Sequence, residues 1–388
     1  MDLQVNPSLI YPKIFDNKTS ALKSADVRED SLLARFVDQN ETTRLMLINY
    51  LSSNQKLDPL LEKTLTFIWI FFITTGLISN SILIIVIMFS RNLQSPNTLL
   101  LCNLFIADVT YSLLSMPFTL ATILHRSWPL GTVLCKAVPF IQTNTAFVTA
   151  GTVTAIAIDR QYRIMCNSYR VHRISFFHPS YGLRMSISIW LFSMALSSPL
   201  LYFQRLETVL QVADFSLDIC HEISFHPKLR LIYHSIVYGF FIFVPTLTLG
   251  ISYIRIRSYL NYNGIEKRRQ TYLLSSSGMN ENQVSILIRK FDFLQKEITC
   301  NTKVTIILFM GILIYVISWL PLCLFNFYMD FFHSSLTASD ITLQTIIFHV
   351  IATTSATTNA FIYGYLNTNI QKELSRWFDK LMARKCFY

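Results

Sequence analysis

The sequence predicts an all-α membrane protein: a bundle of seven transmembrane helices followed by a short amphipathic eighth helix. Two observations carry this prediction. Apolar residues make up 52% of the 388 residues and charged residues only 14%, whereas a soluble chain of this length would need far more charged surface. Seven apolar stretches are also long enough to cross a hydrocarbon core of about 30 Å.

The seven stretches lack the strict alternation of polar and apolar residues that marks the strands of a membrane barrel, so we expect helices. Charge within them is rare: the first has none, and the second has only Asp108. The stretches cover residues 65–89, 92–124, 137–158, 185–204, 231–254, 304–329 and 341–370.

The distribution of Lys and Arg among the short loops predicts which side of the bundle faces the cytoplasm. Basic residues gather between the third and fourth helices, between the fifth and sixth, and in the tail, whereas the opposite loops are mixed or acidic. The net charge of +10 is therefore attributed to cytoplasmic loops and not to nucleic-acid binding. We expect a plasma-membrane protein with an extracellular N-terminus and a cytoplasmic C-terminus.

The chain preceding the first helix predicts an extracellular arm. Residues 1–62 are polar and mixed in charge, which is typical of disorder, and Asn17 and Asn40 begin two glycosylation sequons. No apolar run lies near the start, so we expect no cleaved signal peptide and assign that role to the first helix. The seven-helix domain then covers residues 63–366, with its longest cytoplasmic loop at 260–296.

The last segment, residues 367–388, carries apolar residues at helical spacing on one face and basic residues between them. This pattern predicts a short helix at the membrane surface, in contact with lipid. Cys386 follows this helix and is a candidate for palmitoylation. The alternative is a free cytosolic thiol.

Two of the seven cysteines fall on the predicted extracellular side. Cys135 lies at the outer end of the third helix and Cys220 in the loop before the fifth, where the environment is oxidising, so we expect a disulfide between them. It would tie that loop over the entrance of the bundle. The other cysteines are expected to be free, and no His/Cys spacing indicates zinc.

Ionisable and polar residues at membrane depth are costly to bury and often functional. A lone carboxylate at Asp108 needs a cation, a proton or strong donors. Asn80, Thr149, Ser355 and Asn359 lie at similar depth on other helices, so these five residues are a candidate Na⁺ site. The alternative is a protonated, hydrogen-bonded Asp108 with no ion. No nucleophile–base pair or metal cluster indicates an enzyme.

Two further features have the character of conformational switches. Asp159 precedes Arg160 at the cytoplasmic end of the third helix, where an acid can hold the guanidinium in one state and release it in another. The alternative is an arginine that merely reaches the interface. Trp319 stands beside Pro321 inside the sixth helix, where proline removes a backbone hydrogen bond and loosens the helix. An indole there is either plain packing or a packing switch.

Taken together, residues 64–384 resemble the rhodopsin-like G-protein-coupled receptors. Each motif is weak alone, but the ordered set, with a motif in each helix, is specific. The set comprises Gly76-x-x-x-Asn80, Leu104-x-x-Ala107-Asp108, Cys135, Asp159-Arg160, Trp190, Pro245, Tyr253, Trp319-x-Pro321 and Asn359-x-x-x-Tyr363.

Within that family, the chain is similar to the neuropeptide Y/neuropeptide F receptors. The strings that carry this finer resemblance lie at the outer end of the third helix, at its inner end and at the end of the seventh helix. They are Trp128-Pro129-Leu130-Gly131, Cys135-Lys136, Pro139-Phe140-Ile141-Gln142, residues 154–160 and residues 363–369.

This resemblance implies a C-terminally amidated neuropeptide as ligand. It implies that Gln142 contacts the peptide amide, and that Asp330, near Asn326, receives a peptide arginine. An amide side chain offers both a donor and an acceptor, and a carboxylate suits a guanidinium. The alternatives are a structural amide at Gln142 and a solvated loop acid at Asp330. Weaker candidates for the same pocket are Thr119, Thr122 and Phe348.

On the cytoplasmic side, the resemblance implies that Arg160 leaves Asp159 and meets a heterotrimeric G protein, of the inhibitory type, with Tyr253 and Tyr363 assisting. Arrestin is implied as a further partner. Three residues depart from the family pattern. These are Ala360 in place of proline, Gln161 in place of an aromatic residue, and Tyr315 in place of phenylalanine.

Three other readings of the seven helices remain. A transporter or channel is disfavoured because the helices carry few charges and no repeat is visible. A light receptor would need a retinal-binding lysine in the seventh helix, and residues 341–370 contain none. A receptor of the same fold for a different RFamide-like peptide or another ligand is the serious alternative.

Overall fold

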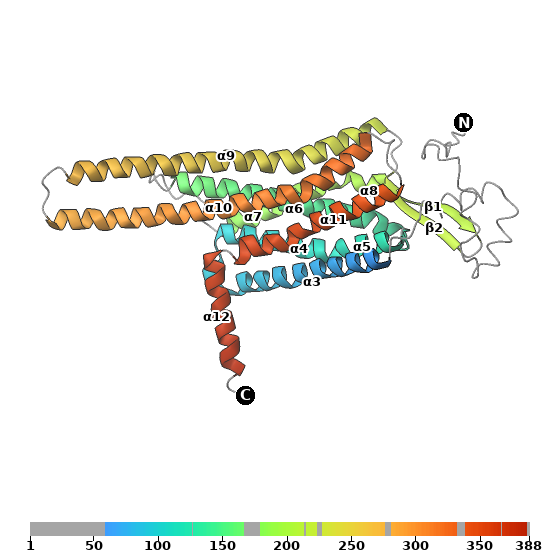
Figure 1. Cartoon of the computed structure of the whole chain (residues 1–388), viewed down its shortest axis with the longest axis horizontal. Helices are drawn as coiled ribbons and strands as arrows, with labels where there is room; N and C mark the ends of the chain where they lie inside the picture. The colour runs from blue at the N-terminus through green and yellow to red at the C-terminus, as the bar shows by residue number, and fades with distance from the viewer. Residues whose placement is uncertain are drawn as a thin grey trace.

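The computed structural model of the chain is a bundle of long helices capped at one end by a two-stranded hairpin (Figure 1). The predicted glycosylation sites Asn17 and Asn40, and the predicted palmitoylation site Cys386, lie outside the described residues. The described residues are 59–125, 127–166, 179–212, 215–222, 227–275, 281–331, 338–365 and 367–385.

Seven membrane helices are present, and two of them are broken by a short irregularity. They are α3 (Pro59–Phe89), α4 (Pro96–Leu114) with α5 (Met116–His125), α6 (Gly131–Cys166), α7 (Pro179–Ser197) with α8 (Pro199–Phe203), α9 (Pro227–Ser275), α10 (Glu281–Phe331) and α11 (Ala338–Asn359). A short 3-10 turn, η3 (Arg91–Leu93), follows α3, and a π-helix, η5 (Ala360–Tyr365), continues α11.

Six of these helical segments are long and apolar enough to cross a membrane by themselves. The exception is α6, which carries several Thr, Asn and Gln residues. Its neighbours explain why this is tolerated, because α6 contacts α4, α7, α9 and α10. From Asn144 to Ala150, every side chain of α6 is buried. A helix that faces protein on most sides does not need the apolar surface that lipid demands.

The breaks in the broken helices fall beside prolines. Pro117 and Pro199 have no backbone N–H to donate, so each weakens the helix that contains it. The α4 helix ends at Leu114, and the residue that follows it, Ser115, has a φ of −122° and a ψ of −55°, which depart from helical values. The predicted seventh span also proved too long at its end, because Ile370 belongs to the next helix, α12 (Thr368–Lys385).

The connection predicted as a long cytoplasmic loop at 260–296 is largely helical. The α9 helix runs 49 residues and α10 runs 51 residues, so both continue well beyond the membrane and lie side by side (Figure 1). Only residues 276–280 of this connection fall outside the description.

At the end of the bundle that is predicted to be extracellular, called the outer end below, the chain between α8 and α9 forms an antiparallel hairpin that was not predicted from the sequence. Strand β1 (Gln204–Val212) pairs with β2 (Phe215–Glu222). The predicted disulfide is confirmed: Cys220 on β2 is bonded to Cys135 on α6. The Trp128 N–H also donates to the Asp218 carbonyl at 2.7 Å. These two links hold the hairpin at the mouth of the bundle.

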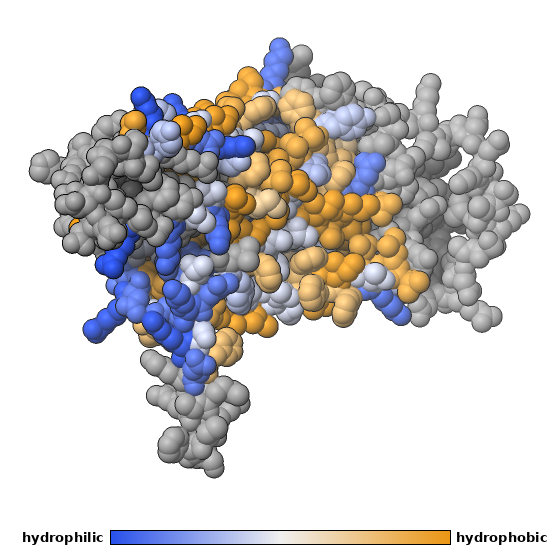
Figure 2. Space-filling view, turned by 60° about the vertical axis from the view of Figure 1, so that its left-hand side comes forward, coloured by the Kyte–Doolittle hydropathy of each residue, from blue (hydrophilic) through white to orange (hydrophobic). Residues whose placement is uncertain are grey.

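The surface of the bundle matches a membrane protein. Figure 2 shows a broad hydrophobic band, with hydrophilic residues gathered toward the end that carries α12. The α12 helix lies crosswise at that end (Figure 1), with Ile370 and Leu374 buried against the bundle. Inside, close helix approach is permitted by Gly76, where a Cβ atom would lie 2.9 Å from the Ser112 Oγ of α4.

Candidate functional site

The outer end of the bundle holds Gln142 half-buried on α6. The Ser115 hydroxyl, at the junction of α4 and α5, donates to Gln142 Oε1 at 3.4 Å. Among the described residues, the amide nitrogen of Gln142 has no partner of its own. Two N–H groups therefore remain available in a polar position above the middle of the bundle.

The other predicted ligand residues come from α5, α10 and α11. The hydroxyls of Thr119 and Thr122 donate to the carbonyls of Ser115 and Phe118, at 3.1 and 2.9 Å, so each keeps its acceptor capacity.

Phe348 of α11 packs against Phe325 of α10, with ring centroids 5.2 Å apart. Asn326 is half-buried on α10, and Asp330 lies one turn further toward the outer end of that helix. The Asp330 side chain is outside the described residues.

Beneath these residues lies an aromatic cluster centred on Trp319. Its indole is buried and lies 5.2 Å from the ring of Phe241 and 5.9 Å from that of Tyr111. The indole N–H donates to the Ser355 hydroxyl of α11 at 3.1 Å. Trp319 thereby joins α4, α9, α10 and α11, and any movement of α10 must repack it.

Tyr315, one of the departures from the family pattern, has a specific partner. Its hydroxyl donates to the Phe241 carbonyl of α9 at 3.2 Å. In an α-helix that carbonyl would accept from the residue four positions later, which here is Pro245 and has no N–H. The added hydroxyl thus satisfies a carbonyl that the proline leaves open, and it ties α10 to α9.

Midway through the membrane, Asp108 is buried and accepts from the Asn359 amide, with Nδ2–O distances of 3.4 and 3.2 Å. Asn80 donates to the carbonyls of Gly76 and Ala356, at 2.8 and 3.0 Å, and so joins α3 to α11. Its Oδ1 atom is buried without a hydrogen bond among the described residues.

Of the other two predicted sodium-site residues, Ser355 bonds to Trp319, and Thr149 is buried on α6. The structure therefore connects Asp108 to Asn359 directly, while Asn80, Thr149 and Ser355 are buried on neighbouring helices without a direct bond to that carboxylate among the described contacts.

At the inner end of α6, Asp159 is buried and Arg160 half-buried, and both engage partners. Gln161, the second departure, turns toward α9: the Ser252 hydroxyl donates to its Oε1 at 2.8 Å. Tyr253 stacks on Phe309 of α10, with ring centroids 4.7 Å apart. Polar and aromatic contacts thus join α6, α9 and α10 beside the predicted switch.

The third departure from the family pattern, Ala360 in place of proline, lies where the helix changes from α to π type. The π-helix η5 begins at Ala360, which is fully buried, and includes Tyr363, whose side chain is not described. A π-helix is a local widening that often occurs at functional sites. The irregularity expected from a proline is therefore present here without one.

A polar chain that was not predicted from the sequence links three helices. Trp190 of α7 donates from Nε1 to Asn103 Oδ1 of α4 at 2.9 Å, and Asn103 Nδ2 donates to Thr152 Oγ1 of α6 at 2.8 Å. Asn103 and Thr152 are buried. The sequence shows that Asn103 is a polar residue inside a membrane span, which needs a partner, but it does not show which helices supply that partner.

A second missed group lies at the mouth of the bundle. His234 Nε2 of α9 lies 3.1 Å from Glu222 Oε2 of β2. Gln204 of β1 donates to the other oxygen of that carboxylate at 3.2 Å. These contacts attach the hairpin to α9, as the disulfide attaches it to α6. The contact between His234 and Glu222 could not be predicted from the sequence, because the hairpin that carries Glu222 was not predicted.

Comparison with known proteins agrees with this geometry. The chain is 27% identical to the Neuropeptide F receptor of Drosophila melanogaster over 375 residues, 94% of this chain and 70% of that protein. It is 29% identical to the human Neuropeptide Y receptor type 2 over 311 residues, 77% of this chain and 72% of that protein. It is 28% identical to the Xenopus laevis Neuropeptide Y receptor type 1 over 313 residues, 79% of this chain and 78% of that protein.

The family model described as 7 transmembrane receptor (rhodopsin family) matches residues 79–363. This range begins within α3, one residue before Asn80, and ends at Tyr363 in η5. It includes the aromatic cluster around Trp319, Asp108 and the Asp159–Arg160 pair. The chain is thus a multi-pass membrane receptor and not an enzyme, and it belongs to the rhodopsin family of seven-transmembrane receptors.

Proposed function

We propose that this receptor is activated by an extracellular neuropeptide with an amidated C-terminus, of the neuropeptide Y/F type, and signals through a heterotrimeric G protein. The observation that carries the proposal is Gln142, a half-buried amide at the outer end of α6 whose N–H groups have no partner among the described residues. A peptide amide presents the complementary carbonyl and N–H groups. The names of the relatives point to the same ligand class.

In this proposal, the peptide enters beside the hairpin and places its terminal amide at Gln142. An arginine of the peptide lies against Asp330, because a carboxylate binds a guanidinium through paired charge-assisted hydrogen bonds. Asn326 supports that contact from the same face of α10, one helical turn away. Thr119 and Thr122 offer acceptor oxygens, and Phe348 offers an apolar wall.

Binding then favours one of two arrangements of the bundle. Pro321 lets α10 bend, and Trp319 repacks within its aromatic cluster. At the inner face, Arg160 leaves Asp159 and meets the G protein, with Tyr253 and Tyr363 assisting. We propose an inhibitory G protein and, as a further partner, arrestin.

The middle of the bundle is proposed to hold a sodium ion. The residues fit a small cation because Asp108 receives hydrogen bonds only from Asn359 among the described residues, and the Asn80 Oδ1 atom is buried without a donor. Thr149, Ser355 and Asn359 supply further oxygens. When bound, the ion would neutralise the carboxylate at membrane depth.

The proposed topology places the N-terminal arm outside the plasma membrane, glycosylated at Asn17 and Asn40. The tail lies in the cytoplasm, where α12 rests on membrane lipid and Cys386 is palmitoylated. The basic residues of the inner loops support this orientation.

The proposal is tested by measuring G-protein activation in cells against a panel of amidated peptides. We expect a response to an Arg-Phe-amide or Arg-Tyr-amide peptide and none to the same peptide with a free carboxyl terminus. Silence to every such peptide at normal surface expression would refute the ligand class. A response only to RFamides unrelated to neuropeptide Y/F would favour the same fold with a different peptide.

A substitution tests the arginine contact. Asp330→Ala should weaken an arginine-containing agonist by about 10- to 100-fold, since a charge-assisted contact contributes about 1.5–3 kcal/mol. The same agonist with citrulline in place of arginine should lose no further potency on this variant. Unchanged potency of the parent peptide would show that Asp330 is not its partner.

A further inference from the structure

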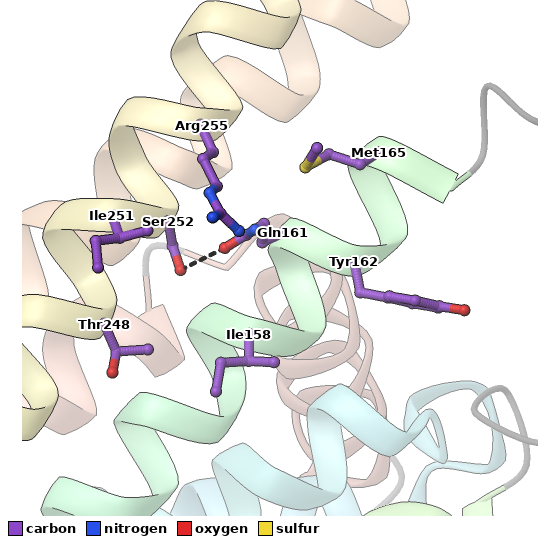
Figure 3. A pocket seen from close by; sticks show the side chains of 8 residues that line it. All are labelled: Ile158, Gln161, Tyr162, Met165, Thr248, Ile251, Ser252 and Arg255. Carbon is purple, nitrogen blue, oxygen red and sulfur yellow. Dashed lines mark hydrogen bonds between the residues drawn. The ribbon is translucent and has the colours of Figure 1, made fainter.

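A hollow lies on the side of the bundle between α6 and α9, near the inner end of α6 and midway along α9. Its volume is about 560 Å³. Figure 3 shows Ile158, Gln161 and Met165 facing it from α6, with Ile251, Ser252 and Arg255 facing it from α9. The hydrogen bond from Ser252 to Gln161 closes its floor.

The depth of this hollow follows from the length of α6. Cys135 is held at the outer surface by the disulfide, and the 26 residues from Cys135 to Gln161 span about 39 Å at 1.5 Å per residue. A bilayer measures about 30 Å across its hydrocarbon core and about 40–45 Å with its headgroups. Gln161 and Arg255 therefore lie at the level of the inner headgroups, and Ile158 lies at the edge of the hydrocarbon.

The wall of the hollow is open to the membrane and apolar toward the core. Ile158 is 52% exposed and Ile251 is 50% exposed. Side chains of this kind at that depth contact lipid, since water is absent from the hydrocarbon core. The apolar half of the hollow thus fits an acyl chain.

The inner rim of the hollow is basic. Arg255 is the only charged residue of its lining, is exposed, and has no hydrogen bond or ion pair within the described part of the chain. In Figure 3 its guanidinium extends toward Gln161, over the inner end of the hollow. Because Gln161 Oε1 accepts from Ser252, the NH₂ group of Gln161 remains a second donor beside the guanidinium.

We propose that this hollow is a binding site for an anionic phospholipid of the inner leaflet. The guanidinium of Arg255 pairs with the headgroup phosphate, for which its planar fork of donors is well suited. The Gln161 amide adds a neutral hydrogen bond, and one acyl chain lies against Ile158 and Ile251. The inner leaflet supplies the required ligand, because it is rich in anionic lipid.

The site has a consequence for the switch beside it. A lipid that contacts both Gln161 and Arg255 bridges α6 and α9, and Gln161 follows Arg160 in the chain. The lipid therefore stabilises the arrangement in which Gln161 meets Ser252. This inference does not depend on which peptide binds outside.

The test uses the full-length receptor in nanodiscs that contain a phosphatidylserine or a phosphatidylcholine probe, each with a photoreactive diazirine in the same acyl chain. Labelling is mapped to the peptides that contain Ile158 and Ile251. We expect the phosphatidylserine probe to label these peptides about fivefold more than the phosphatidylcholine probe, the effect of one basic side chain at an anionic surface. Equal labelling by the two probes would overturn the proposal.

Four variants locate the effect. Arg255→Gln should abolish the preference for phosphatidylserine, and Arg255→Lys should keep most of it. Arg269→Gln, an exposed cation further along α9, should leave it unchanged. Ile251→Trp, which fills the hollow, should reduce labelling at Ile158 by both probes. A preference that survives Arg255→Gln would show that the headgroup binds elsewhere.

Discussion

The outer end and the middle of the bundle use polar side chains in opposite ways. In the middle, three amide groups bond to partners on other helices: Asn359 to Asp108, Asn80 to Ala356, and Asn103 to Trp190. At the outer end, the amide nitrogen of Gln142 has no such partner among the described residues. The difference teaches that these three amides join neighbouring helices, whereas the N–H groups of Gln142 are left without a partner among the described residues.

The largest expected effect tests the outer side of this comparison. Gln142→Leu should weaken an amidated peptide agonist by about 10- to 100-fold, because the buried peptide amide would lose its partner. The thermal midpoint of the purified receptor should stay within about one degree, since the variant removes one long contact to Ser115. Radioligand binding and a thermal-shift assay measure the two quantities. A large loss of thermal stability with unchanged peptide affinity would show that Gln142 stabilises the bundle and does not bind the peptide.

The role of amides in the middle of the bundle is tested by Asn103→Leu. This change leaves Trp190 Nε1 and the Thr152 hydroxyl without their partner, and should destabilise the bundle by about 1–2 kcal/mol. Peptide affinity should stay unchanged. Thr110→Val is the matched control on the same helix, because the Thr110 hydroxyl bonds only within α4. Equal thermal shifts in both variants would show that the hydrogen bonds between helices add no more stability than a hydrogen bond within α4.

A smaller effect is expected at the boundary between the two regions. Tyr315→Phe removes the hydroxyl that occupies the Phe241 carbonyl, a contact between helices worth about 0.6–1.7 kcal/mol. Since that contact ties α10 to α9, its loss should raise basal G-protein activation several-fold. Nucleotide exchange without agonist measures it. Trp319 keeps its own contacts in this variant, so an unaltered basal rate would mean that the hydroxyl does not restrain α10.

The smallest effect is expected at Ala360. Proline there would remove the N–H that faces the Ala356 carbonyl, but Asn80 already donates to that carbonyl at 3.0 Å. Ala360→Pro should therefore cost less than about 1 kcal/mol. Ala352→Pro in the same helix has no such substitute donor and should lose about 3 kcal/mol or more. Thermal shifts of the two variants give the contrast, and equal losses would contradict it.

Much of this architecture could be predicted from the sequence. The apolar stretches, and the loops that carry the basic residues, depend on local composition, and all seven became helices. The Cys135–Cys220 disulfide followed from the compartment of both cysteines. The lengths of α9 and α10 could not be predicted from the sequence, because a helix beyond the membrane and a loop have a similar polar composition.

The missed contacts have a different cause. The partnership of Tyr315 with Phe241 requires knowing which turn of α10 faces Pro245, and the bonds of Asn103 require knowing how α4, α6 and α7 meet. The hairpin at residues 204–222 depends on its attachment to α6 and α9 more than on its own pattern. Such pairings between distant segments are set by packing, which a single sequence does not display.

The continuation of α10 beyond the membrane has a mechanical consequence. The 40 residues from Pro321 to Glu281 form an arm of about 60 Å at 1.5 Å per residue. If α10 turns about Pro321 as a stiff rod, each degree of rotation carries the far end through about 1 Å. A repacking of Trp319 that turns α10 by only a few degrees would thus displace the far tip of the arm by several ångströms.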